Sequence, residues 1–276
     1  MKIFLQDKAF AHCEFSNNPL PVKQRTDKVE WDRTDTYTDD DTVVWTDVMI
    51  PEAIKRNGKN IAWLIEAMPY HQGYYNFVHE NRDKFHQIWT HDKQMLDSCE
   101  NAKFLPLGGC WIDEWDWAMH EKTKDFSIIA SMHKYLPGHK LRHDIVAGTQ
   151  GKVDLWGRGY KEMDDKIDGL KDYRYTFCIE NFRKDYWFTE KLIDCFVTGT
   201  LPIYWGCPSI GNIFNTEGML CFEDIRQLPE LLKGCTPEYY ESKKDAMKEN
   251  FELAKQFRLA ELKIPDYIYE GINVFG

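Results

Sequence analysis

The sequence predicts an α/β fold with two Rossmann-like domains, and three observations support this prediction. Residues 175–206 read as a strand, a polar loop, a helix and a second strand. Residues 126–157 repeat this order of elements. In the first hundred or so residues, short apolar strands alternate with helical segments, which is typical of a parallel sheet. A chain of 276 residues can hold two domains, which we place at 1–120 and 121–276.

The composition argues against several classes of protein. The formal net charge of -10 makes nucleic acid an improbable partner. The eight cysteines show no Cys-x-x-Cys pair and no zinc-site spacing, so we expect free thiols in a reducing compartment. The N-terminus MKIFLQDKAF turns polar too soon for a signal peptide, and no stretch has the apolar length of a membrane span. These features favour a soluble, cytoplasmic protein. Aromatic residues make up 14% of the chain, which suits either sugar-stacking platforms or an aromatic-rich core.

Local patterns predict the elements of the first half. Residues 16–42 are polar and turn-rich, so we expect a long loop there. The acidic triplet Asp39 to Asp41 could be a metal-binding motif, but it precedes its strand instead of following it, so a solvated loop is the better interpretation. The histidines of this half show no metal-ligand spacing. We expect strands over 2–5, 43–45, 60–65, 87–90 and 104–107, and helices over 51–57, 79–85 and 91–99.

A carboxylate stands at the carboxyl end of the expected strand over 60–65. Glu66 follows this strand directly and precedes Ala67-Met68-Pro69. A carboxylate can accept the proton of an attacking hydroxyl when it lies within hydrogen-bonding reach. The alternative is a surface or helix-capping glutamate without a chemical role.

The second half begins with a βαβ unit whose polar residues gather near the first strand end. Ser131 and Lys134 lie in the loop, and Arg142 lies in the first turns of the helix. A planar guanidinium such as that of Arg142 can bridge two phosphate oxygens, although a surface helix arginine is the alternative. Gly157 and Arg158 end the next strand, where glycine lets the backbone approach a ligand. We expect strands over 126–130 and 153–157, with the helix over 139–147.

The next βαβ unit has a polar loop between two apolar strands. We expect a strand over Tyr175 to Ile179, a helix capped by Thr189 and ended by Gly199, and a strand over Leu201 to Tyr204. Ligands of parallel sheets collect beyond the carboxyl ends of the strands, where the N–H groups of the next helix favour an anion. Here that zone holds Glu180, Asn181, Arg183, Lys184, Asp185, Tyr186, Trp187, Glu190 and Lys191.

Three further elements are expected after this unit. Residues 219–222 read as a strand, residues 225–233 as a helix, and residues 237–262 as a long charged amphipathic helix. The tail IPDYIYEGINVF is apolar enough to pack back on the body of the protein.

The segment Glu180-Asn181, then T-E-K-L at 189–192 and G-T-L-P-I-Y-W-G at 199–206, resembles the donor-site signature of the α1,3-fucosyltransferases, glycosyltransferase family 10. The resemblance covers roughly residues 126–225, with one more short segment near Glu66. It implies the GT-B arrangement, two Rossmann-like domains facing a cleft. It also implies transfer of a sugar, fucose as first choice, from a nucleotide-diphosphate donor to a carbohydrate hydroxyl with inversion. The implied partners are a nucleotide sugar and a glycan acceptor.

The resemblance assigns donor-binding roles to single residues. Asn181, Glu190 and Lys191 fall on the family's Asn, Glu and Lys. Lys191 would contact phosphate, Glu190 would accept from ribose or sugar hydroxyls, and Asn181 would fix the loop or the donor. The tyrosine that the family carries six residues after the asparagine is replaced by Trp187, with Tyr186 one place earlier. This departure leaves the donor less certain.

The resemblance also suggests the catalytic groups. Glu66 occupies the place of a short E-S-P-like segment that supplies the general base, although E-A-M-P is one residue longer. Arg142 matches an arginine that holds the donor pyrophosphate. Arg142 and Lys191 would stabilise the departing diphosphate, so we expect no metal cofactor.

Three alternatives remain open at this stage. The donor could be another nucleotide sugar such as UDP-xylose. A glycoside hydrolase would need two opposed carboxylates, for which Glu66 and Glu190 could be imagined, but a hydrolase has no use for a phosphate-binding helix start. A protein that binds nucleotide or carbohydrate without turnover would keep the same fold. If Glu66 is not the base, Asp113 and Glu114 are the next candidates.

Overall fold

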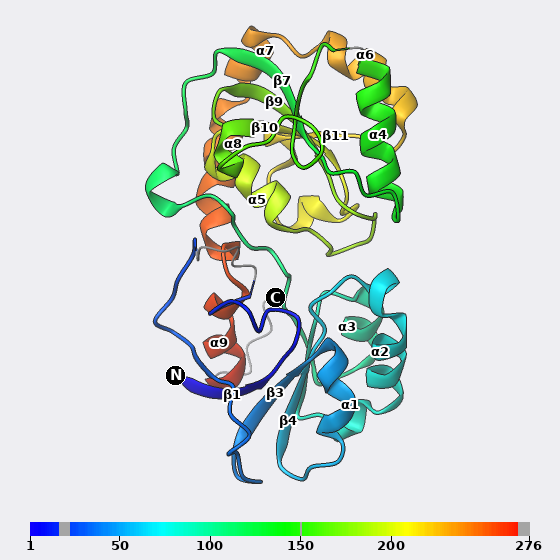
Figure 1. The fold of residues 1–276 in the computed structure, drawn as a ribbon, viewed down its shortest axis with the longest axis vertical. Helices are drawn as coiled ribbons and strands as arrows, with labels where there is room; N and C mark the ends of the chain where they lie inside the picture. The colour runs from blue at the N-terminus through cyan, green and yellow to red at the C-terminus, as the bar shows by residue number, and fades with distance from the viewer. Residues whose placement is uncertain (17–22, 150, 270–276) are drawn as a thin grey trace. The chain divides into compact units, whose positions relative to one another are not determined.

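The computed structural model describes residues 1–16, 23–149 and 151–269, which form two compact units (Figure 1). Unit 1 comprises Met1–Gly109 and Leu259–Gly276, and unit 2 comprises Cys110–Arg258. Each unit contains one parallel sheet with helices packed against it. The predicted α/β fold with two Rossmann-like domains is therefore confirmed.

The sheet of unit 1 has six parallel strands in the order β2-β1-β3-β4-β5-β6. The strand order reverses between β1 and β3, which makes the crevice at their carboxyl ends the expected ligand position in an open α/β sheet. The strands are β1 (Lys2–Gln6), β2 (Glu30–Asp32), β3 (Thr42–Thr46), β4 (Lys59–Trp63), β5 (Gln87–Thr90) and β6 (Ala102–Phe104).

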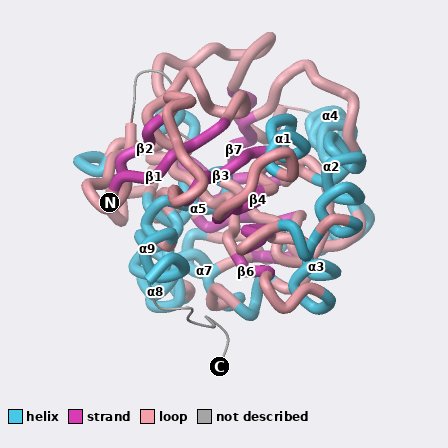
Figure 2. Tube along the Cα trace, turned by 90° about the horizontal axis from the view of Figure 1, so that it is seen from below, coloured by secondary structure: helices cyan, strands magenta, loops and turns pink. Residues whose placement is uncertain are grey.

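Successive side chains of β3 enter two different cores. Val43 and Trp45 pack with α1 (Ile50–Ala53), α2 (Met68–Glu80) and α3 (Lys93–Ser98), whereas Val44 packs on the opposite face. On that opposite face, Ile264 and Tyr267 of α9 (Ile264–Tyr269) are buried. Figures 1 and 2 show α1, α2 and α3 along one side of β3 and β4, and α9 on the other. Both faces of the sheet are covered, as a parallel sheet requires.

The sheet of unit 2 repeats the same kind of strand order, β8-β7-β9-β10-β11. The order reverses between β7 and β9, which is the second expected ligand position. The strands are β7 (Lys124–Ile129), β8 (Asp154–Trp156), β9 (Tyr173–Ile179), β10 (Leu201–Trp205) and β11 (Leu220–Cys221), and the helices are α4 (Pro137–Thr149), α5 (Glu190–Val197), α6 (Leu228–Lys233), α7 (Pro237–Ser242) and α8 (Lys244–Ala254).

The division of the chain differs from the expected 1–120 and 121–276 because two segments pack elsewhere. The backbone N–H of Trp111 donates to Asp194 at 2.7 Å, and that of Ala118 donates to the carbonyl of Val197 at 3.0 Å. These contacts attach the segment after Gly109 to unit 2. Residues 259–269 return to the core of unit 1, as expected for the apolar tail, whose last residues, 270–275, lie outside the described part of the chain.

Three expected elements differ from the structure. Strand β2 lies inside the segment expected to be a loop, where three residues pair with β1. Helix α2 begins at Met68 instead of residue 79, since Pro69 stands in the first turn, where a missing N–H costs no bond. The expected helix over 237–262 is interrupted into α7, α8 and two 3₁₀ turns. Thr189 caps α5 and Gly199 follows it with a φ of 63°, as predicted.

None of the eight cysteines forms a disulfide, and six of them are buried. Within the described part of the chain, no helix combines the length and the apolar character needed to cross a membrane.

Candidate functional site

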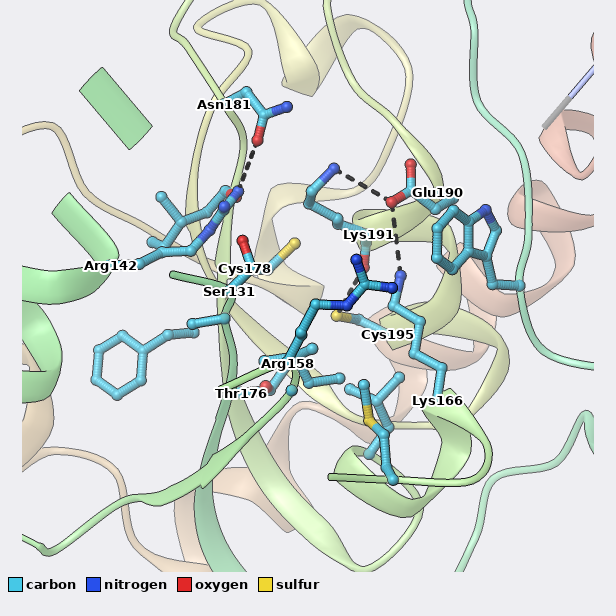
Figure 3. A pocket seen from close by; sticks show the side chains of 18 of the residues that line it. Ser131, Arg142, Arg158, Lys166, Thr176, Cys178, Asn181, Glu190, Lys191 and Cys195 are labelled. Carbon is cyan, nitrogen blue, oxygen red and sulfur yellow. Dashed lines mark hydrogen bonds and ion pairs between the residues drawn. The ribbon is translucent and has the colours of Figure 1, made fainter. Parts of the chain in front are cut away.

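A cavity of about 460 Å³ lies in unit 2 at the switch point between β7 and β9 (Figure 3). Its walls come from the ends of both strands, the first turns of α4 and α5, and the loop after β8. Its polar lining is dominated by cationic side chains. The residues with ionisable or hydroxyl groups are Ser131, His139, Arg142, Arg158, Lys166, Thr176, Cys178, Glu190, Lys191 and Cys195, and Asn181 and Trp111 are also present.

Arg142 fixes α4 against the end of β9. Its Nε donates to the carbonyl of Ile179 at 3.2 Å, and its Nη2 donates to that same carbonyl and to Oδ1 of Asn181, the latter at 3.0 Å. The N–H of Gly138 donates to the carbonyl of Asn181 at 2.9 Å. A Cβ on Gly138 would lie 1.7 Å from the carbonyl oxygen of Glu180, so only glycine permits this approach. The buried guanidinium of Arg142 therefore forms part of the cavity wall.

Gly157 allows the loop after β8 to sit beside the end of β7. Its φ is 111°, and a Cβ there would lie 2.1 Å from the carbonyl oxygen of Ala130. The close approach brings Arg158 to the cavity near Ser131. In Figure 3, Arg142 and Asn181 lie on one side of the cavity, and Glu190, Lys191 and Lys166 on the other.

A buried carboxylate closes the loop between β9 and α5. Glu180 is fully buried and accepts from the backbone N–H of Thr189 at 2.9 Å and from its hydroxyl at 2.8 Å. Burial raises the pKa of Glu180, and the nearby Lys191 opposes this shift. The hydroxyl of Thr189 in turn accepts from the N–H of Lys191. The hydrogen bonds between Glu180 and Thr189 thus join the E-N segment to the T-E-K-L segment.

Two lysines share the carboxylate of Glu190 at the N-terminus of α5. Nζ of Lys191 lies 3.2 Å from Oε1 of Glu190, and Nζ of Lys166 lies 3.6 Å from the same atom. Burial acts to raise the pKa of Glu190, but Lys191 and then Lys166 outweigh it and lower the pKa to about 2. Glu190 is therefore a carboxylate at any working pH and can only accept hydrogen bonds.

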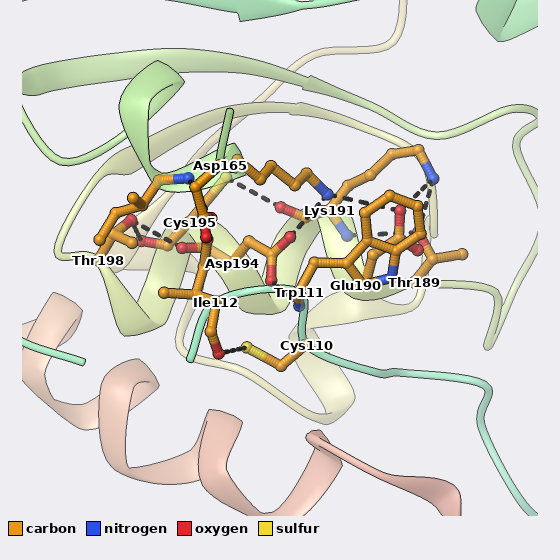
Figure 4. A network of polar contacts seen from close by, with 12 residues as sticks. Cys110, Trp111, Ile112, Asp165, Thr189, Glu190, Lys191, Asp194, Cys195 and Thr198 are labelled. Atoms are coloured by element: carbon orange, nitrogen blue, oxygen red, sulfur yellow. Dashed lines mark hydrogen bonds and ion pairs between the residues drawn. The ribbon is translucent and has the colours of Figure 1, made fainter. Parts of the chain in front are cut away.

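Lys166 also forms a buried ion pair that reaches Trp111. Its Nζ lies 2.6 Å from Oδ2 of Asp194 and 4.7 Å from the centroid of the Trp111 ring. Burial opposes the charge of Lys166, but the carboxylates of Asp194 and Glu190 outweigh it and raise the pKa of the lysine. Figure 4 shows Asp194 beside Trp111, with Glu190 and Lys191 of the first turn of α5 next to the tryptophan. Lys166 and Trp111 were not predicted as site residues. Asp194 could have pointed to them, because a charge on the apolar face of α5 needs a buried partner.

His139 adds a neutral donor to the cavity. Burial, followed by the charge of Arg142, lowers the pKa of His139 to about 4. The N–H of Leu136 donates to Nδ1 of His139 at 3.2 Å. Because Nδ1 accepts this bond, the ring proton resides on Nε2, which can donate to a ligand oxygen.

Most of the predicted donor residues line the cavity, and three do not. The three are Lys134, which is exposed in the loop after β7, and the adjacent residues Tyr186 and Trp187. Trp187 is buried against Phe182, with ring centroids 5.1 Å apart. The N–H of Tyr186 donates to Oγ of Ser209 at 3.0 Å. Both aromatic residues therefore support the loop between β9 and α5. Those in the lining are Ser131, Arg142, Gly157, Arg158, Asn181, Glu190 and Lys191.

In unit 1, Glu66 follows β4 as predicted and is partly exposed. Asp47, which sequence reasoning missed, follows the adjacent strand β3 and is 2% exposed. Its Oδ1 accepts from the N–H of Ile65 at 3.1 Å, and its Oδ2 accepts from the N–H of Glu66 at 3.3 Å. Burial raises the pKa of Asp47 to about 7, and the charges of Glu66 and Asp7 add to the shift, against the hydrogen bonds from Ile65 and Glu66.

The acidic triplet lies in a turn before β3. Asp41 accepts from the N–H of Thr38 at 2.7 Å, and Arg56 pairs with Asp39 at 3.9 Å and donates to the carbonyl of Asp41. Because all strands of this sheet are parallel, the triplet stands at the amino edge, away from the strand ends that carry Asp47 and Glu66. In residues 1–16, 23–149 and 151–269, no group of three or more His, Cys, Asp or Glu residues is arranged to hold a metal ion.

Comparison of sequences relates this chain to fucosyltransferases over a short segment. No family model matches the chain. It is 34% identical over 74 residues to the α-(1,3)-fucosyltransferase FucT of Helicobacter pylori, a match that covers 27% of this chain and 15% of that protein. It is 32% identical over 65 residues to a fucosyltransferase-like protein of Arabidopsis thaliana, covering 22% of this chain and 13% of that protein. The matches thus span about one seventh of the curated relatives.

Comparison of structures extends the likeness to most of the fold. A solved α1,3-fucosyltransferase with GDP-fucose aligns with a TM-score of 0.54 at 17% identity, covering 80% of this chain and 72% of that chain. The apo structure of OtsA aligns with a TM-score of 0.59 at 9% identity, covering 86% and 74%. TarM aligns with a TM-score of 0.56 at 10% identity, covering 82% and 54%. The resemblance to α1,3-fucosyltransferases and the GT-B type of fold are confirmed.

We predict that Asp47→Asn changes how stability depends on pH. The pKa of Asp47 is about 7 in the folded protein and about 4 in an unfolded chain, so folding favours the protonated form. The stability that this preference contributes is present below pH 4 and is lost as the pH rises to 7. An amide does not titrate, so the free energy of unfolding of the variant relative to the wild type should increase by roughly 2 to 4 kcal/mol between pH 4 and pH 8.

Denaturant titrations at a series of pH values measure this difference. Asp40→Asn, in an exposed turn of the same unit, is the matched control and should leave the pH dependence unchanged. Parallel curves for Asp47→Asn and the wild type would show that Asp47 does not titrate in this range.

Proposed function

We propose that this protein is an inverting glycosyltransferase that transfers a sugar from a nucleotide-diphosphate donor to a carbohydrate hydroxyl. The observation that carries the proposal is the cationic cavity at the switch point of unit 2, whose walls include Asn181, Glu190 and Lys191 of the fucosyltransferase-like donor signature. A negative diphosphate suits this position because the positively charged side chains of Arg142, Arg158 and Lys191 are complementary to it.

The departing diphosphate gains negative charge in the transition state of such a transfer. Cations that are already held in place stabilise this charge without reorganising, and such preorganised electrostatics is commonly the largest catalytic contribution. Lys191 is held by Glu190 and by the hydroxyl of Thr189 at 3.0 Å. Arg142 is held by Ile179 and Asn181. These contacts support metal-independent transfer, with the two side chains acting where a metal ion would otherwise act.

Fucose is the first choice of donor sugar, and GDP the first choice of nucleotide. The choice rests on likeness to an α1,3-fucosyltransferase solved with GDP-fucose and to another solved with GDP. Glu190, a carboxylate at working pH, would accept from ribose or sugar hydroxyls. UDP-xylose or a related donor is the alternative, because Trp187 stands where the α1,3-fucosyltransferases carry tyrosine. Trp187 packs against Phe182 in the loop between β9 and α5 and does not line the cavity.

Glu66 is our candidate for the general base that takes the proton from the acceptor. It stands at the carboxyl end of β4 on the sheet of unit 1, with its side chain partly open to solvent. The free cysteines support a reducing compartment as the place of action.

The first prediction concerns nucleotide affinity. Lys191→Ala and Arg142→Ala should each weaken GDP binding about tenfold to a hundredfold, because each removes a charge-assisted contact worth roughly 1.5 to 3 kcal/mol. Isothermal titration calorimetry with GDP and UDP measures the change and also ranks the two bases. Lys134→Ala removes the same charge from an exposed residue outside the cavity and should bind as the wild type does. Unchanged affinity in both cavity variants would remove the donor-site assignment.

The second prediction is that turnover needs no divalent cation. Release of nucleoside diphosphate in the presence of a glycan acceptor should proceed equally in excess EDTA and in magnesium or manganese. Loss of turnover in EDTA, restored by manganese, would contradict the proposed role of the cationic side chains and would return attention to Asp39–Asp41.

The third prediction concerns Glu66. Glu66→Gln preserves the shape of the side chain but cannot accept a proton, so kcat should fall by roughly a hundredfold to ten-thousandfold. The Kd for the donor nucleotide should stay unchanged, because the cavity belongs to unit 2. Glu80→Gln, a surface substitution on α2, is the control. Turnover near that of the wild type in folded Glu66→Gln would shift the base assignment to Asp113 or Glu114.

A further inference from the structure

Three carboxylates follow three adjacent strands at the switch point of unit 1. Asp7 follows β1, Asp47 follows β3 and Glu66 follows β4, and these strands are neighbours in the sheet. Ligands of open α/β sheets bind at such a point. Only Glu66 has a role in the proposed reaction, so the two buried carboxylates beside it require an explanation.

Asp47 occupies a strained position on the chain. Its φ is 35°, one of two positive values among the non-glycine residues that the structure describes. It forms the bend between β3 and the 3₁₀ turn Asp47–Met49 that leads into α1. Backbone strain of this kind persists only where surrounding contacts hold it, and it is concentrated at functional sites.

The contacts that hold Asp47 converge on the backbone of Glu66. The two carboxylate oxygens of Asp47 accept from two consecutive N–H groups, those of Ile65 and Glu66. The hydroxyl of Tyr75, on α2, donates to the carbonyl of Glu66 at 2.8 Å. The peptide units on both sides of the Glu66 Cα are therefore fixed, one by Asp47 and the other by Tyr75.

The charged groups that act on Asp47 follow β1 and β4, and Tyr75 of α2 lies near it with His91 and Asp92 at its hydroxyl. Asp7 lies beyond the end of β1 and accepts from the hydroxyl of Thr46 at 2.7 Å. Glu66 lies beyond β4, and Tyr75 on α2 interacts with the charge of Asp47. Arg33 lies 4.0 Å from Asp7. Asp47 thus has like charges on two sides.

We propose that Asp47 is a positioning residue for the proton transfer at Glu66, because its carboxylate clamps the end of β4 and fixes the direction of the Glu66 side chain. This inference rests on the proposed function, in which Glu66 is the base. A carboxylate is suited to the clamp because it has two acceptor oxygens for two successive N–H groups. Asparagine tolerates the same positive φ but offers one acceptor oxygen, so it would keep the bend and lose one of the two bonds.

A double-mutant cycle of Asp47→Asn and Glu66→Gln tests the inference. We expect Asp47→Asn to lower kcat about tenfold to a hundredfold, with the donor KM unchanged. Loss of a merely structural contact would instead lower kcat by the same factor whether or not Glu66 is present. In the Glu66→Gln background, Asp47→Asn should lower kcat by less than twofold, because the group that it positions is already disabled.

Two further variants guard against misfolding and local disturbance. Asp47→Gly removes the carboxylate and relieves the positive φ, so it should reproduce the loss of kcat if the asparagine variant does not fold. Thr46→Val breaks the bond to Asp7 at the same strand end but leaves the contacts of Asp47 with Ile65 and Glu66 in place. It should lower Tm and leave kcat within twofold of the wild type.

The outcomes separate this inference from the proposed function. If Glu66→Gln loses turnover but the asparagine and glycine variants of Asp47 do not, the positioning role alone is overturned. An equal loss from Asp47→Asn in the wild-type and Glu66→Gln backgrounds would overturn it as well, because Asp47 would then act independently of Glu66. If wild-type protein binds GDP but transfers no sugar from any donor tested, the proposed function fails, and the inference falls with it.

Discussion

The wall of the cavity in unit 2 depends on one buried contact, the pair of hydrogen bonds between Glu180 and Thr189. The carboxylate of Glu180 satisfies both the N–H and the hydroxyl of Thr189, and that hydroxyl meets the N–H and Nζ of Lys191. The loop of eight residues between them is thereby closed. Asn181 begins this loop, and Glu190 follows Thr189 as the first residue of α5. Without Glu180, Thr189 would be left with a buried N–H unpaired at the start of α5, and such a loss is costly because nothing else replaces it. The T-E-K-L segment therefore both caps α5 and contributes Glu190 and Lys191 to the cavity wall.

Each unit has a buried carboxylate beside the switch point of its sheet, and burying the charged form of that carboxylate costs free energy. Glu180 follows β9 and holds the next helix, whereas Asp47 follows β3 and holds the end of the neighbouring strand β4. Burial raises the pKa of each group, which means that folding works against their charge. Neutral side chains would avoid this cost but would offer fewer acceptors for consecutive N–H groups. The carboxylates are explained by what they orient, which in unit 2 is the first turn of α5 and in unit 1 is Glu66.

The fold was largely predictable because each βαβ unit is formed by one continuous segment of the chain. The residues of the cavity were predictable only where they directly follow a strand or flank the loop after it. Strand β5 was predicted to the residue, and Asn181, Glu190 and Lys191 were identified because they flank one loop. Lys166 was missed because its role arises from a partner distant in sequence, Asp194. His139 was missed because the burial that lowers its pKa is a property of the fold and not of the local sequence. Lys134 and Trp187 lie in the predicted loops but not in the cavity lining, because Lys134 is exposed and Trp187 packs against Phe182. Sequence position alone does not fix the direction of a side chain in a loop. Helix α2 was placed too late because Pro69 and Gly73 obscure its periodicity.

The cationic side chains of the cavity in unit 2 differ in how strongly carboxylates of the protein neutralise them. Lys166 is held by Asp194 at 2.6 Å and is buried beside Trp111, so its charge mainly compensates an acid on the apolar face of α5. Lys191 shares Glu190 with it and is more accessible, with a quarter of its side chain exposed. Arg158 is exposed at the cavity and comes from a loop that Gly157 brings close to β7. A diphosphate would therefore meet a fixed set of charges on α4 and α5 and an adaptable one on the loop after β8. In the proposed reaction, the fixed charges would stabilise the leaving group without reorganising, whereas the exposed Arg158 would contact the donor as it enters and the product as it leaves.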